Sequence, residues 1–415
     1  NMIIASCPLR ISLFGGSTDN PYFVAKYGYG SVISFASNLK TYVTISQDKF
    51  GFNKKDHKYV INYSRREEVK HISEIKNEVV RGVLEHFNMP PVQVTLTSDA
   101  FSQGSGLASS SSYIISLIKA CSLFLHKKIS DTDICRLAYD IEVKFNPFCG
   151  YQDPYGCGIG GFKRIEFLDT GSVKHEFLST DVFDDIDIKL VFTGVTRNSK
   201  EVLRDVSMNL EKIKPLLPIV STAYDYLKQG DSKKFLKELN HTWEEKKKTS
   251  NIITENERIR KIDKELSDNS SVISHKLCGA GNGGFFLTFS KHNKLTIPYD
   301  TVKIKDTSDT SFKKALDEAI KVKEKHNLEI VPANYHSRKN GKKAITKGVI
   351  IAEGVCLARN LENRPGNVST PSHLADHARK IGKTPDMKVT VFEREKFTKM
   401  GTKDYFRRRF GNNFS

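Results

Sequence analysis

Residues 104–112 combine a glycine-rich turn with the start of a helix. The turn is Gly104-Ser105-Gly106-Leu107-Ala108, and four consecutive serines follow it, Ser109 to Ser112. Apolar residues then recur at helical spacing, which predicts a helix that begins near Ser109 and buries one face. That face comprises Ile114, Leu117, Ile118, Cys121, Phe124 and Leu125. Because unpaired N–H groups and the helix dipole favour an anion at a helix N-terminus, the turn is a candidate phosphate site.

The serine hydroxyls of this segment add hydrogen-bond donors and can offer oxygen to a hard cation such as Mg²⁺. A serine-rich helix cap after a surface turn is the alternative interpretation. The segment is not a Walker A loop, because no Gly-Lys-Ser/Thr follows it, and it is not a GxGxxG motif.

The composition is that of an ordinary globular protein, with 38% hydrophobic and 27% charged residues over 415 positions, enough for two or three domains. No apolar run is long enough to span a membrane, and the first residues lack the pattern of a signal peptide. The seven cysteines are scattered without a CxxC pair, which favours reduced thiols. We therefore expect a cytoplasmic protein that does not bind a membrane.

The net charge of +17 raises the possibility of nucleic-acid binding. Residues 306–415 hold 23 Lys and Arg against 13 Asp and Glu, a balance of +10 that leaves +7 for residues 1–305. No zinc finger, basic zipper or RNA-binding motif accompanies this charge. We therefore expect no nucleic-acid partner, and the charge suits phosphorylated small anions equally well.

The predicted elements alternate in the manner of an α+β fold. Strands are expected at Met2–Ala5, Pro8–Phe14, Ser31–Ser46, Val92–Leu96, Asp187–Thr193 and Phe285–Phe289. Helices are expected at Glu74–Phe87, from a capping Ser130 onward, and in long amphipathic segments reaching about Gly230 and Lys264. Lys54–Arg66 is expected to be irregular, and Gly150–Gly158 to be rich in turns.

Three glycine-rich segments and two acids, Glu142 and Asp153, form a pattern that is more specific than any one part. It resembles the GHMP kinases, which include galactokinase, homoserine kinase and mevalonate kinase. The likeness lies in Pro8–Asp19, in Gly104–Ser110 and in Cys278–Gly284, in that order, and it covers about residues 2–300. Within this superfamily the chain resembles the D-glycero-D-manno-heptose 7-phosphate kinases most. That branch is suggested by Phe14-Gly15-Gly16 with Thr18-Asp19, by Gln152-Asp153, by Phe192 to Arg197 and by Trp243 to Lys247.

The resemblance implies a two-domain GHMP kinase fold. Residues 1–180 would form an N-terminal ATP-binding α/β domain with a left-handed βαβ unit, and residues 181–305 a ferredoxin-like C-terminal domain. The active site would lie between the two domains.

The resemblance also implies a role for each matching residue. Gly104, Ser105, Gly106, Leu107, Ala108, Ser109 and Ser110 would bind the phosphates of ATP. Ser110, with Ser109 as the competing choice, and Glu142 would hold Mg²⁺, which neutralises charge on the γ-phosphoryl group. Asp153 would accept or orient the proton of the sugar hydroxyl, with the Arg10 cation beside it. Gly15, Gly16, Asp19 and Gly281 would contribute to the substrate site, and Thr196 and Arg197 would hold the substrate's own phosphate.

Each of these residues also has a simpler interpretation when it is taken alone. Arg10 would be a surface ion-pair partner, and Asp153, next to Pro154, a turn former. Glu142 would be a solvated charge at a helix end, and Thr196-Arg197 would cap the next helix. The combination of motifs favours the functional interpretation for Arg10, Asp153 and Glu142. It supports the functional interpretation of Thr196-Arg197 least.

The chain departs from the usual family pattern at three places. Phe101-Ser102-Gln103 stands where the family usually has a proline, Ala108 replaces the commoner glycine, and Asn282 interrupts the third glycine run. Reduced activity would be consistent with these changes, while loss of the fold is not expected.

Residues 306–415 do not match the kinase pattern. Ala352–Leu361, Asn363–Asn367 and Thr370-Pro371 are similar to the segment that begins the catalytic domain of leucine aminopeptidases. The metal-binding Lys, Asp and Glu cluster of that family lies beyond this segment, so peptidase activity is not expected. We predict that residues 306–415 are an incomplete segment, poorly ordered or loosely packed.

These features together predict an ATP- and Mg²⁺-dependent sugar kinase. The expected acceptor is the anomeric hydroxyl of a heptose 7-phosphate. The alternatives are another GHMP sugar kinase of the fucose or hexose type, and a catalytically weak sugar- or nucleotide-binding relative. The sequence does not predict an oligomeric state.

Overall fold

The computed structural model describes residues 2–48, 50–51, 53–100, 104–196, 199–292, 294–305 and 329–330. The chain divides into two compact units, Asn1–Thr346 and Lys347–Ser415, and all described residues belong to the first. Apart from Glu329 and Ile330, the predicted extension at 306–415 lies outside the described residues. Its incomplete folding therefore stays a prediction, as do the predicted domain boundaries.

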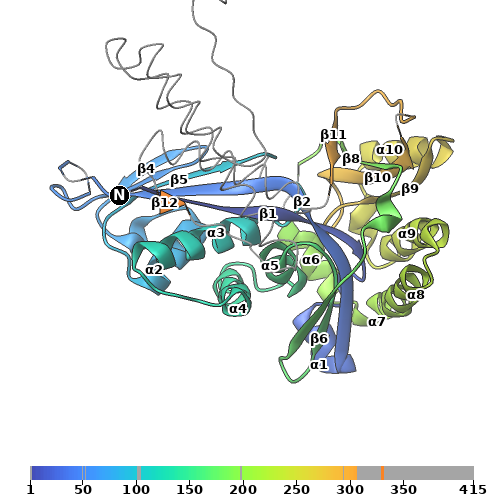
Figure 1. Cartoon of the computed structure of the whole chain (residues 1–415), viewed down its shortest axis with the longest axis horizontal. Helices are drawn as coiled ribbons and strands as arrows, with labels where there is room; N and C mark the ends of the chain where they lie inside the picture. The colour runs from blue at the N-terminus through green and yellow to red at the C-terminus, as the bar shows by residue number, and fades with distance from the viewer. Residues whose placement is uncertain are drawn as a thin grey trace, which may run out of the picture. The chain divides into compact units, whose positions relative to one another are not determined.

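The first sheet has eight strands, with β12, β1, β2, β5, β3 and β4 in that spatial order and with β6 and β7 attached to β2 (Figure 1). The strands are β1 (Met2–Phe14), β2 (Tyr29–Ser46), β3 (Tyr59–Asn62), β4 (Arg66–Val69), β5 (Gln93–Ser98), β6 (Phe162–Leu168), β7 (Val173–Phe177) and β12 (Glu329–Ile330). The strands predicted at Met2–Ala5 and Pro8–Phe14 are one strand, β1. Its register against β2 shifts between Pro8 and Arg10, because a proline cannot donate a ladder hydrogen bond.

Helices cover one face of this sheet: α3 and α5 contact β1 and β2, and α2 and α4 pack beside α3 (Figure 1). The helices of this part are α1 (Pro21–Tyr27), the short η1 (Ile72–Glu74), α2 (Glu78–Phe87), α3 (Ser109–Phe124), α4 (Asp131–Glu142) and α5 (Gln152–Ile159). The predicted start of α3 at Ser109 is confirmed, and its apolar residues Ile114, Leu117 and Ile118 are fully buried against the sheet. The predicted cap of α4 is also confirmed, since the Ser130 hydroxyl accepts the Asp133 N–H.

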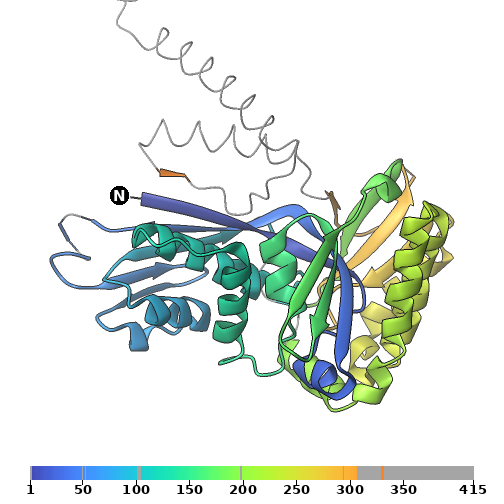
Figure 2. The same ribbon diagram turned by 60° about the horizontal axis from the view of Figure 1, so that its bottom comes forward.

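The second sheet is antiparallel and has four strands in the order β11, β8, β10, β9. Its strands are β8 (Ile186–Phe192), β9 (Val272–Leu277), β10 (Phe285–Lys291) and β11 (Thr301–Ile304). Its helices are the short η2 (Asp181–Phe183), α6 (Ser199–Ser207), α7 (Leu210–Ile213), α8 (Leu216–Lys228), α9 (Ser232–Lys247), the short η3 (Asn251–Thr254) and α10 (Glu257–Asp268). Figure 2 shows these helices packed together beside the sheet. Trp243 of α9 is buried edge-on against Phe286 of β10, so the amphipathic helices predicted here bury their apolar faces on the strands.

Two predictions about local structure were wrong. Tyr59–Asn62, inside the segment expected to be irregular, is strand β3 and pairs parallel with β5. Gln152–Ile159, expected to be rich in turns, is helix α5. Its glycines serve close packing, since a Cβ on Gly156 would lie 2.5 Å from Arg10 Cγ and one on Gly158 would lie 2.3 Å from Cys135 Sγ. Tertiary contact therefore overrides the low helix propensity of glycine, and Pro154 is tolerated in the first turn because its position needs no intrahelical N–H.

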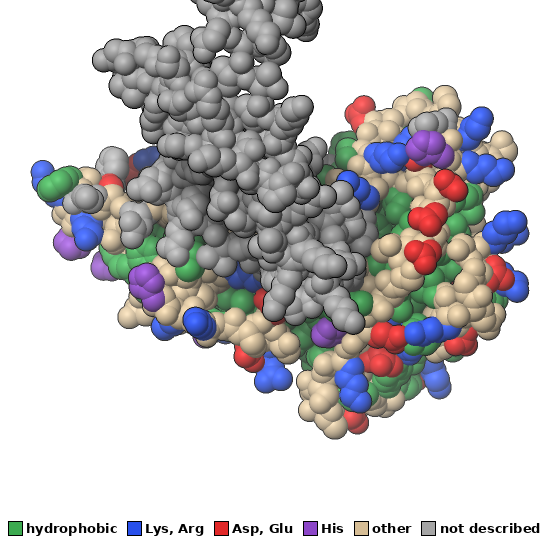
Figure 3. Space-filling model, in the orientation of Figure 1, with side chains coloured by type: hydrophobic (Ala, Val, Ile, Leu, Met, Phe, Trp, Pro, Cys, Tyr) green, Lys and Arg blue, Asp and Glu red, His purple; other side chains and the backbone are tan. Residues whose placement is uncertain are grey.

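The surface visible in Figure 3 mixes Lys and Arg with Asp and Glu over the second sheet and its helices. Within the described ranges, no helix combines the length and apolar character needed to cross a membrane. The six cysteines in those ranges are buried free thiols.

Candidate active site

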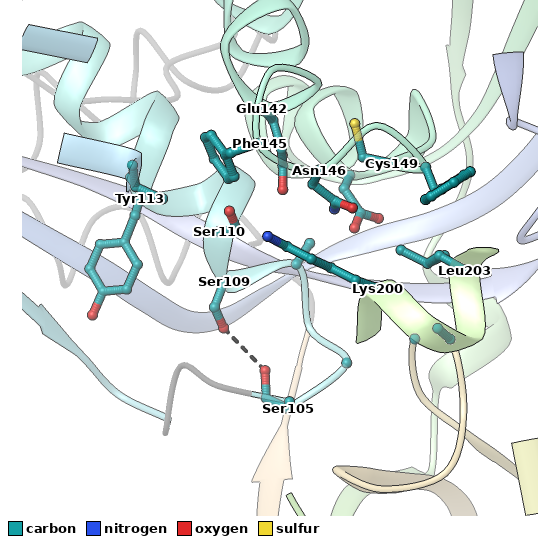
Figure 4. Close-up of a pocket in the computed structure, with 18 of the residues that line it drawn as sticks. Ser105, Ser109, Ser110, Tyr113, Glu142, Phe145, Asn146, Cys149, Lys200 and Leu203 are labelled. Carbon is teal, nitrogen blue, oxygen red and sulfur yellow. Dashed lines mark hydrogen bonds between the residues drawn. The ribbon is translucent and has the colours of Figure 1, made fainter. Parts of the chain in front are cut away.

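A cavity of about 1490 Å³ lies between the first sheet with its helices and the helices of the second sheet (Figure 4). The glycine–serine turn, Arg10, Asp19, Glu142 and Asp153 all line it. Thr196, Lys200 and Lys246 line it from the C-terminal side. The structure therefore brings residues far apart in the sequence to one site.

The glycine–serine turn approaches the cavity through its backbone. Gly104, Ser105, Gly106, Ala108, Ser109 and Ser110 line the cavity, whereas Leu107 is buried in the hydrophobic core. Gly106 and Ala108 have φ values of 76° and 60°, so the chain makes a left-handed bend just before α3 begins. The hydroxyls of Ser105 and Ser109 are hydrogen-bonded at 3.1 Å across this bend (Figure 4).

The third glycine run packs directly on this turn. A Cβ on Gly106 would lie 2.5 Å from the Cys278 carbonyl oxygen, and one on Gly279 would lie 2.5 Å from Gly106 Cα. A Cβ on Gly284 would meet the carbonyl oxygen of Ser105 at 2.5 Å. The two loops thus touch backbone to backbone, which only glycine permits at these positions.

Two of the three departures from the family pattern keep the backbone conformation. Ala108 has φ of 60° and Asn282 has φ of 58°, both in the left-handed region. Asparagine tolerates this region, whereas alanine is strained there by about 1–2 kcal/mol. The third departure, Phe101-Ser102-Gln103, lies outside the described residues.

Arg10 and Asp153 form an ion pair in the wall of the cavity. Arg10 is only 3% exposed, and its Nη2 donates to Asp153 Oδ1. Its Nη1 donates to the Gly106 carbonyl at 3.3 Å, and its backbone N–H donates to the Leu107 carbonyl at 3.1 Å. One guanidinium group therefore ties the glycine–serine turn to the first turn of α5. The Arg10 Nε is buried without a hydrogen-bond partner in the described part of the chain.

Asp19 fixes the turn that follows β1. Its carboxylate accepts the Ser17 N–H at 3.0 Å and the Gln152 N–H at 2.9 Å, so it also anchors the start of α5. Burial raises the pKa of Asp19 to about 6, against the lowering effect of the Gln152 hydrogen bond. Gly15 packs on the Ser31 carbonyl and does not line the cavity, while Gly16 lies beside Gln152 and Lys246.

Glu142, at the end of α4, faces the start of α3. It is 4% exposed and accepts a hydrogen bond from the Ser111 hydroxyl. Burial raises the pKa of Glu142 to about 7, while hydrogen bonds from Ser111 and Ser110 lower it. Figure 4 shows Ser110 beside Glu142 at the cavity. A carboxylate with neighbouring hydroxyl oxygens is a donor set that fits Mg²⁺.

Of the predicted substrate residues that the structure describes, Asp19 and Thr196 line the cavity, and Gly15, Gly16 and Gly281 do not. Gly281 packs on Ile253, where an added Cβ would be 2.7 Å from the Ile253 Cγ2. Gly279 and Ala280 line the cavity instead. Thr196 lines it as well, and Arg197 lies outside the described residues.

Several polar residues at the site were not predicted from the sequence, and four of them make contacts that bear on its chemistry. Ser111 contacts Glu142, and Asn146 lines the cavity with a buried Oδ1 that has no partner in the described ranges. Lys200 also lines the cavity, 3.6 Å from Glu78. Lys246 is 8% exposed and donates to the Gly279 carbonyl at 2.9 Å. Lys246 belongs to a run of three lysines, so nothing in the sequence indicates that this one faces inward.

Comparison with known proteins gives separate results for the two parts of the chain. The family model for the GHMP kinases N terminal domain matches residues 74–161. A D-glycero-alpha-D-manno-heptose 7-phosphate kinase from Campylobacter jejuni is 28% identical over 299 residues, covering 68% of this chain and 87% of that protein. A probable cytosol aminopeptidase from Methylibium petroleiphilum is 51% identical over 57 residues. That match covers 14% of this chain and only 12% of the aminopeptidase.

Solved structures share the fold. A D-glycero-D-manno-heptose 1-phosphate kinase from Bacteroides thetaiotaomicron has a TM-score of 0.56 at 22% identity, covering 74% of this chain and 97% of that one. A phosphomevalonate kinase from Streptococcus pneumoniae, in complex with phosphomevalonate and AMPPNP, has a TM-score of 0.58 at 12% identity, covering 70% of this chain and 93% of that one. The predicted fold class and both predicted resemblances are confirmed.

Proposed function

Because the chain contains a GHMP kinase N-terminal domain within the fold of these kinases, we propose that it transfers the γ-phosphoryl group of ATP to a heptose 7-phosphate. The family match and the heptose-phosphate kinase relative make it a phosphotransferase that acts on a sugar hydroxyl. The observation that carries the proposal is the Arg10–Asp153 pair, held between the glycine–serine turn and α5 in the large cavity.

The nucleotide would bind with its phosphates at the turn from Gly104 to Ser110. The turn precedes the N-terminus of a 16-residue helix, where N–H groups favour an anion. The close contact between Gly106 and Gly279 leaves the turn rigid, which reduces the entropy lost on binding.

Mg²⁺ would be held by Glu142 with the hydroxyl of Ser110, and Ser111 would orient the Glu142 carboxylate. Mg²⁺ usually binds one or two carboxylates together with phosphate oxygens of the substrate, and this donor set is of that kind. When bound, the ion neutralises charge on the transferred group.

Asp153 would accept the proton of the attacking hydroxyl, and Arg10 would hold the Asp153 carboxylate in position. Arg10 also offers positive charge next to the glycine–serine turn, where the γ-phosphoryl group would lie. The sugar would bind beside Asp19, with Ser17, Asn20 and Thr196 as further lining groups.

The alternatives differ in acceptor or in activity. A GHMP sugar kinase of the fucose or hexose type would use the same turn and the same acids. A catalytically weak binding relative would be consistent with the strained Ala108. The ion pair and the buried Glu142 favour catalysis, because a pure binding protein has no need for either.

The test is ADP release by the full-length protein with Mg-ATP and a panel of sugars and sugar phosphates. We expect turnover with heptose 7-phosphate and a loss of about 10²–10⁴-fold in kcat for Asp153→Asn. Asp268→Asn, at the exposed end of α10, is the matched control and should keep wild-type activity. Nucleotide binding without turnover on any sugar would overturn the kinase assignment in favour of the binding relative.

A further inference from the structure

We propose that Ser12, Gln152 and Lys246 form a subsite over Gly16 that takes the phosphate group of the acceptor. This inference rests on the proposed kinase function, because it names the chemical class of the sugar that the site accepts. It goes further by assigning the acceptor phosphate to residues other than Thr196 and Arg197.

Three polar atoms from three elements converge on Gly16. The point where a Cβ would lie is 3.3 Å from Gln152 Nε2, 3.4 Å from Ser12 Oγ and 3.6 Å from Lys246 Nζ. Ser12 belongs to β1, Gln152 begins α5 and Lys246 lies near the end of α9. The absence of a side chain on Gly16 leaves room for a ligand oxygen among these three atoms.

Two of these groups are buried without hydrogen-bond partners in the part of the chain that the structure describes. Ser12 is 6% exposed and its Oγ is unpartnered, as is Gln152 Oε1. Buried polar groups are normally paired, so the unpaired Ser12 Oγ, which faces the space over Gly16, indicates a missing partner. The Gln152 atom that faces the same space is the amide nitrogen Nε2, which can donate to an incoming oxygen.

The charge around the subsite favours an anion over a neutral hydroxyl. Lys246 is 8% exposed and Lys276 is 4% exposed, and Lys276 donates to the backbone carbonyls of Ser12 and Leu13 at 3.0 and 2.9 Å. Burial lowers the pKa of Lys276 to about 7, and the positive charges of Lys246 and Arg10 lower it further. The Lys276 ammonium is therefore close enough to Lys246 and to Arg10 to be repelled by both. A phosphate dianion would offset this repulsion, and a neutral sugar would not.

The subsite is joined to the reacting groups through the start of α5. Gln152 is adjacent to Asp153 in the chain, and its backbone N–H donates to Asp19. The phosphate and the sugar ring of one acceptor would thus be held by neighbouring residues. A bound phosphate would position the sugar for attack, so the enzyme would select phosphosugars.

The test compares kcat/KM for heptose 7-phosphate with kcat/KM for the same heptose without its phosphate. We expect the wild-type protein to prefer the phosphosugar, and Lys246→Gln to reduce this preference at least tenfold. Gly16→Ala should reduce it as well, because its methyl group would occupy the subsite. Lys248→Gln is the matched control, since that lysine is on the same helix end and its side chain is 67% exposed. It should keep the wild-type preference.

Binding measured without ATP separates this inference from the kinase assignment. Titration calorimetry with heptose 7-phosphate should show about tenfold weaker binding to Lys246→Gln than to Lys248→Gln, whether or not the protein turns over. Melting temperatures of all variants verify that each is folded.

Three results would overturn the subsite. If Lys246→Gln lowers kcat/KM equally for heptose 7-phosphate and for the heptose without its phosphate, Lys246 acts on the transferred phosphoryl group and not on the phosphate of the acceptor. A lost preference in Arg197→Gln, but not in Lys246→Gln and Gly16→Ala, would place the acceptor phosphate at residues 196–197. If the wild-type protein had the same kcat/KM for the phosphosugar and for the unphosphorylated sugar, it would have no subsite for the acceptor phosphate.

Discussion

Glu142 makes the stability of the protein depend on pH at the scale of one residue. Its pKa is raised by burial from about 4.5 to about 7 in the folded protein. The folded state therefore holds an extra proton between these pH values, so stability falls as pH rises through this window. Above pH 7 the buried charge carries its full cost, of order 1–3 kcal/mol, which is absent below pH 4.5.

We accordingly expect Glu142→Gln to raise the melting temperature of the metal-free protein at pH 8 and to change it little at pH 4.5. Glu85→Gln, on the exposed side of α2, should change neither value. Thermal unfolding at both pH values checks this expectation. A melting temperature at pH 8 that falls in Glu142→Gln would show that the carboxylate is stabilised by its neighbours rather than strained by burial.

Asp19 and Glu142 together predict the acid limb of the activity profile. Burial raises the pKa of Asp19 to about 6 and that of Glu142 to about 7. Since kcat/KM reports groups of the free enzyme, it should fall below pH 7 and fall more steeply below pH 6. In Asp19→Asn we expect a lower kcat/KM with only the limb near pH 7 remaining. If kcat/KM of Asp19→Asn still falls in two steps, near pH 7 and near pH 6, the step near pH 6 belongs to a group other than Asp19.

At the scale of elements, the contact between the two glycine loops is the feature that the nucleotide site depends on. Gly106→Ala places a methyl group 2.5 Å from the Cys278 carbonyl in a residue with φ of 76°. The turn must then move away from the third glycine run, and we expect ATP affinity to drop about tenfold or more, which corresponds to at least 1.4 kcal/mol.

Gly230→Ala provides the comparison for this loop prediction. Gly230 has φ of 70° and would place its new Cβ in open space, so it carries backbone strain without a clash. This strain should lower stability by about 1 kcal/mol and leave ATP affinity unchanged. If Gly106→Ala and Gly230→Ala changed ATP affinity equally, the contact between the two glycine loops would not determine the shape of the nucleotide site.

The elements that could be predicted are those whose own residues show a pattern typical of a helix or a strand. Helix α3 was predicted because its apolar residues repeat at helical spacing and a turn precedes it. Helix α5 was missed because its glycines argue against a helix, and its stability comes from contacts with Arg10 and Cys135 that sequence spacing cannot show. Strand β3 was missed because it is four residues long and is defined by its pairing with β5.

The same distinction applies to the site. The residues of the glycine motifs and the acids Glu142 and Asp153 were predicted through a family resemblance, and most of them line one cavity. Lys246 could not be predicted, because three adjacent lysines look like a solvated helix face until the orientation of α9 is known. Ser111 was passed over for Ser110, because a run of serines does not show which hydroxyl faces Glu142.

For the whole molecule, the chain divides into two compact units at Thr346, and residues 352–371, which were predicted to resemble aminopeptidases, lie in the second unit. Every described residue that lines the cavity lies between Arg10 and Ala280, and strand β12 at Glu329–Ile330 pairs with β1 within the first unit. A protein of residues 1–346 keeps all of these groups. We therefore expect it to retain the kcat/KM of the full chain within about twofold, and to show the same stabilisation by Mg-ATP, since ligand linkage depends only on the site.

Ending the protein at residue 305 should have a different effect, because it removes the backbone pairing of Ile3 and Ile4 with β12. An exposed edge of β1 would lower the melting temperature and favour association between chains, while the cavity residues stay in place. Melting curves and size-exclusion chromatography on the two shortened proteins measure this difference. If instead the 1–346 protein lost its activity with its melting temperature unchanged, residues 347–415 would contribute directly to catalysis, and the kinase site would extend beyond the first unit.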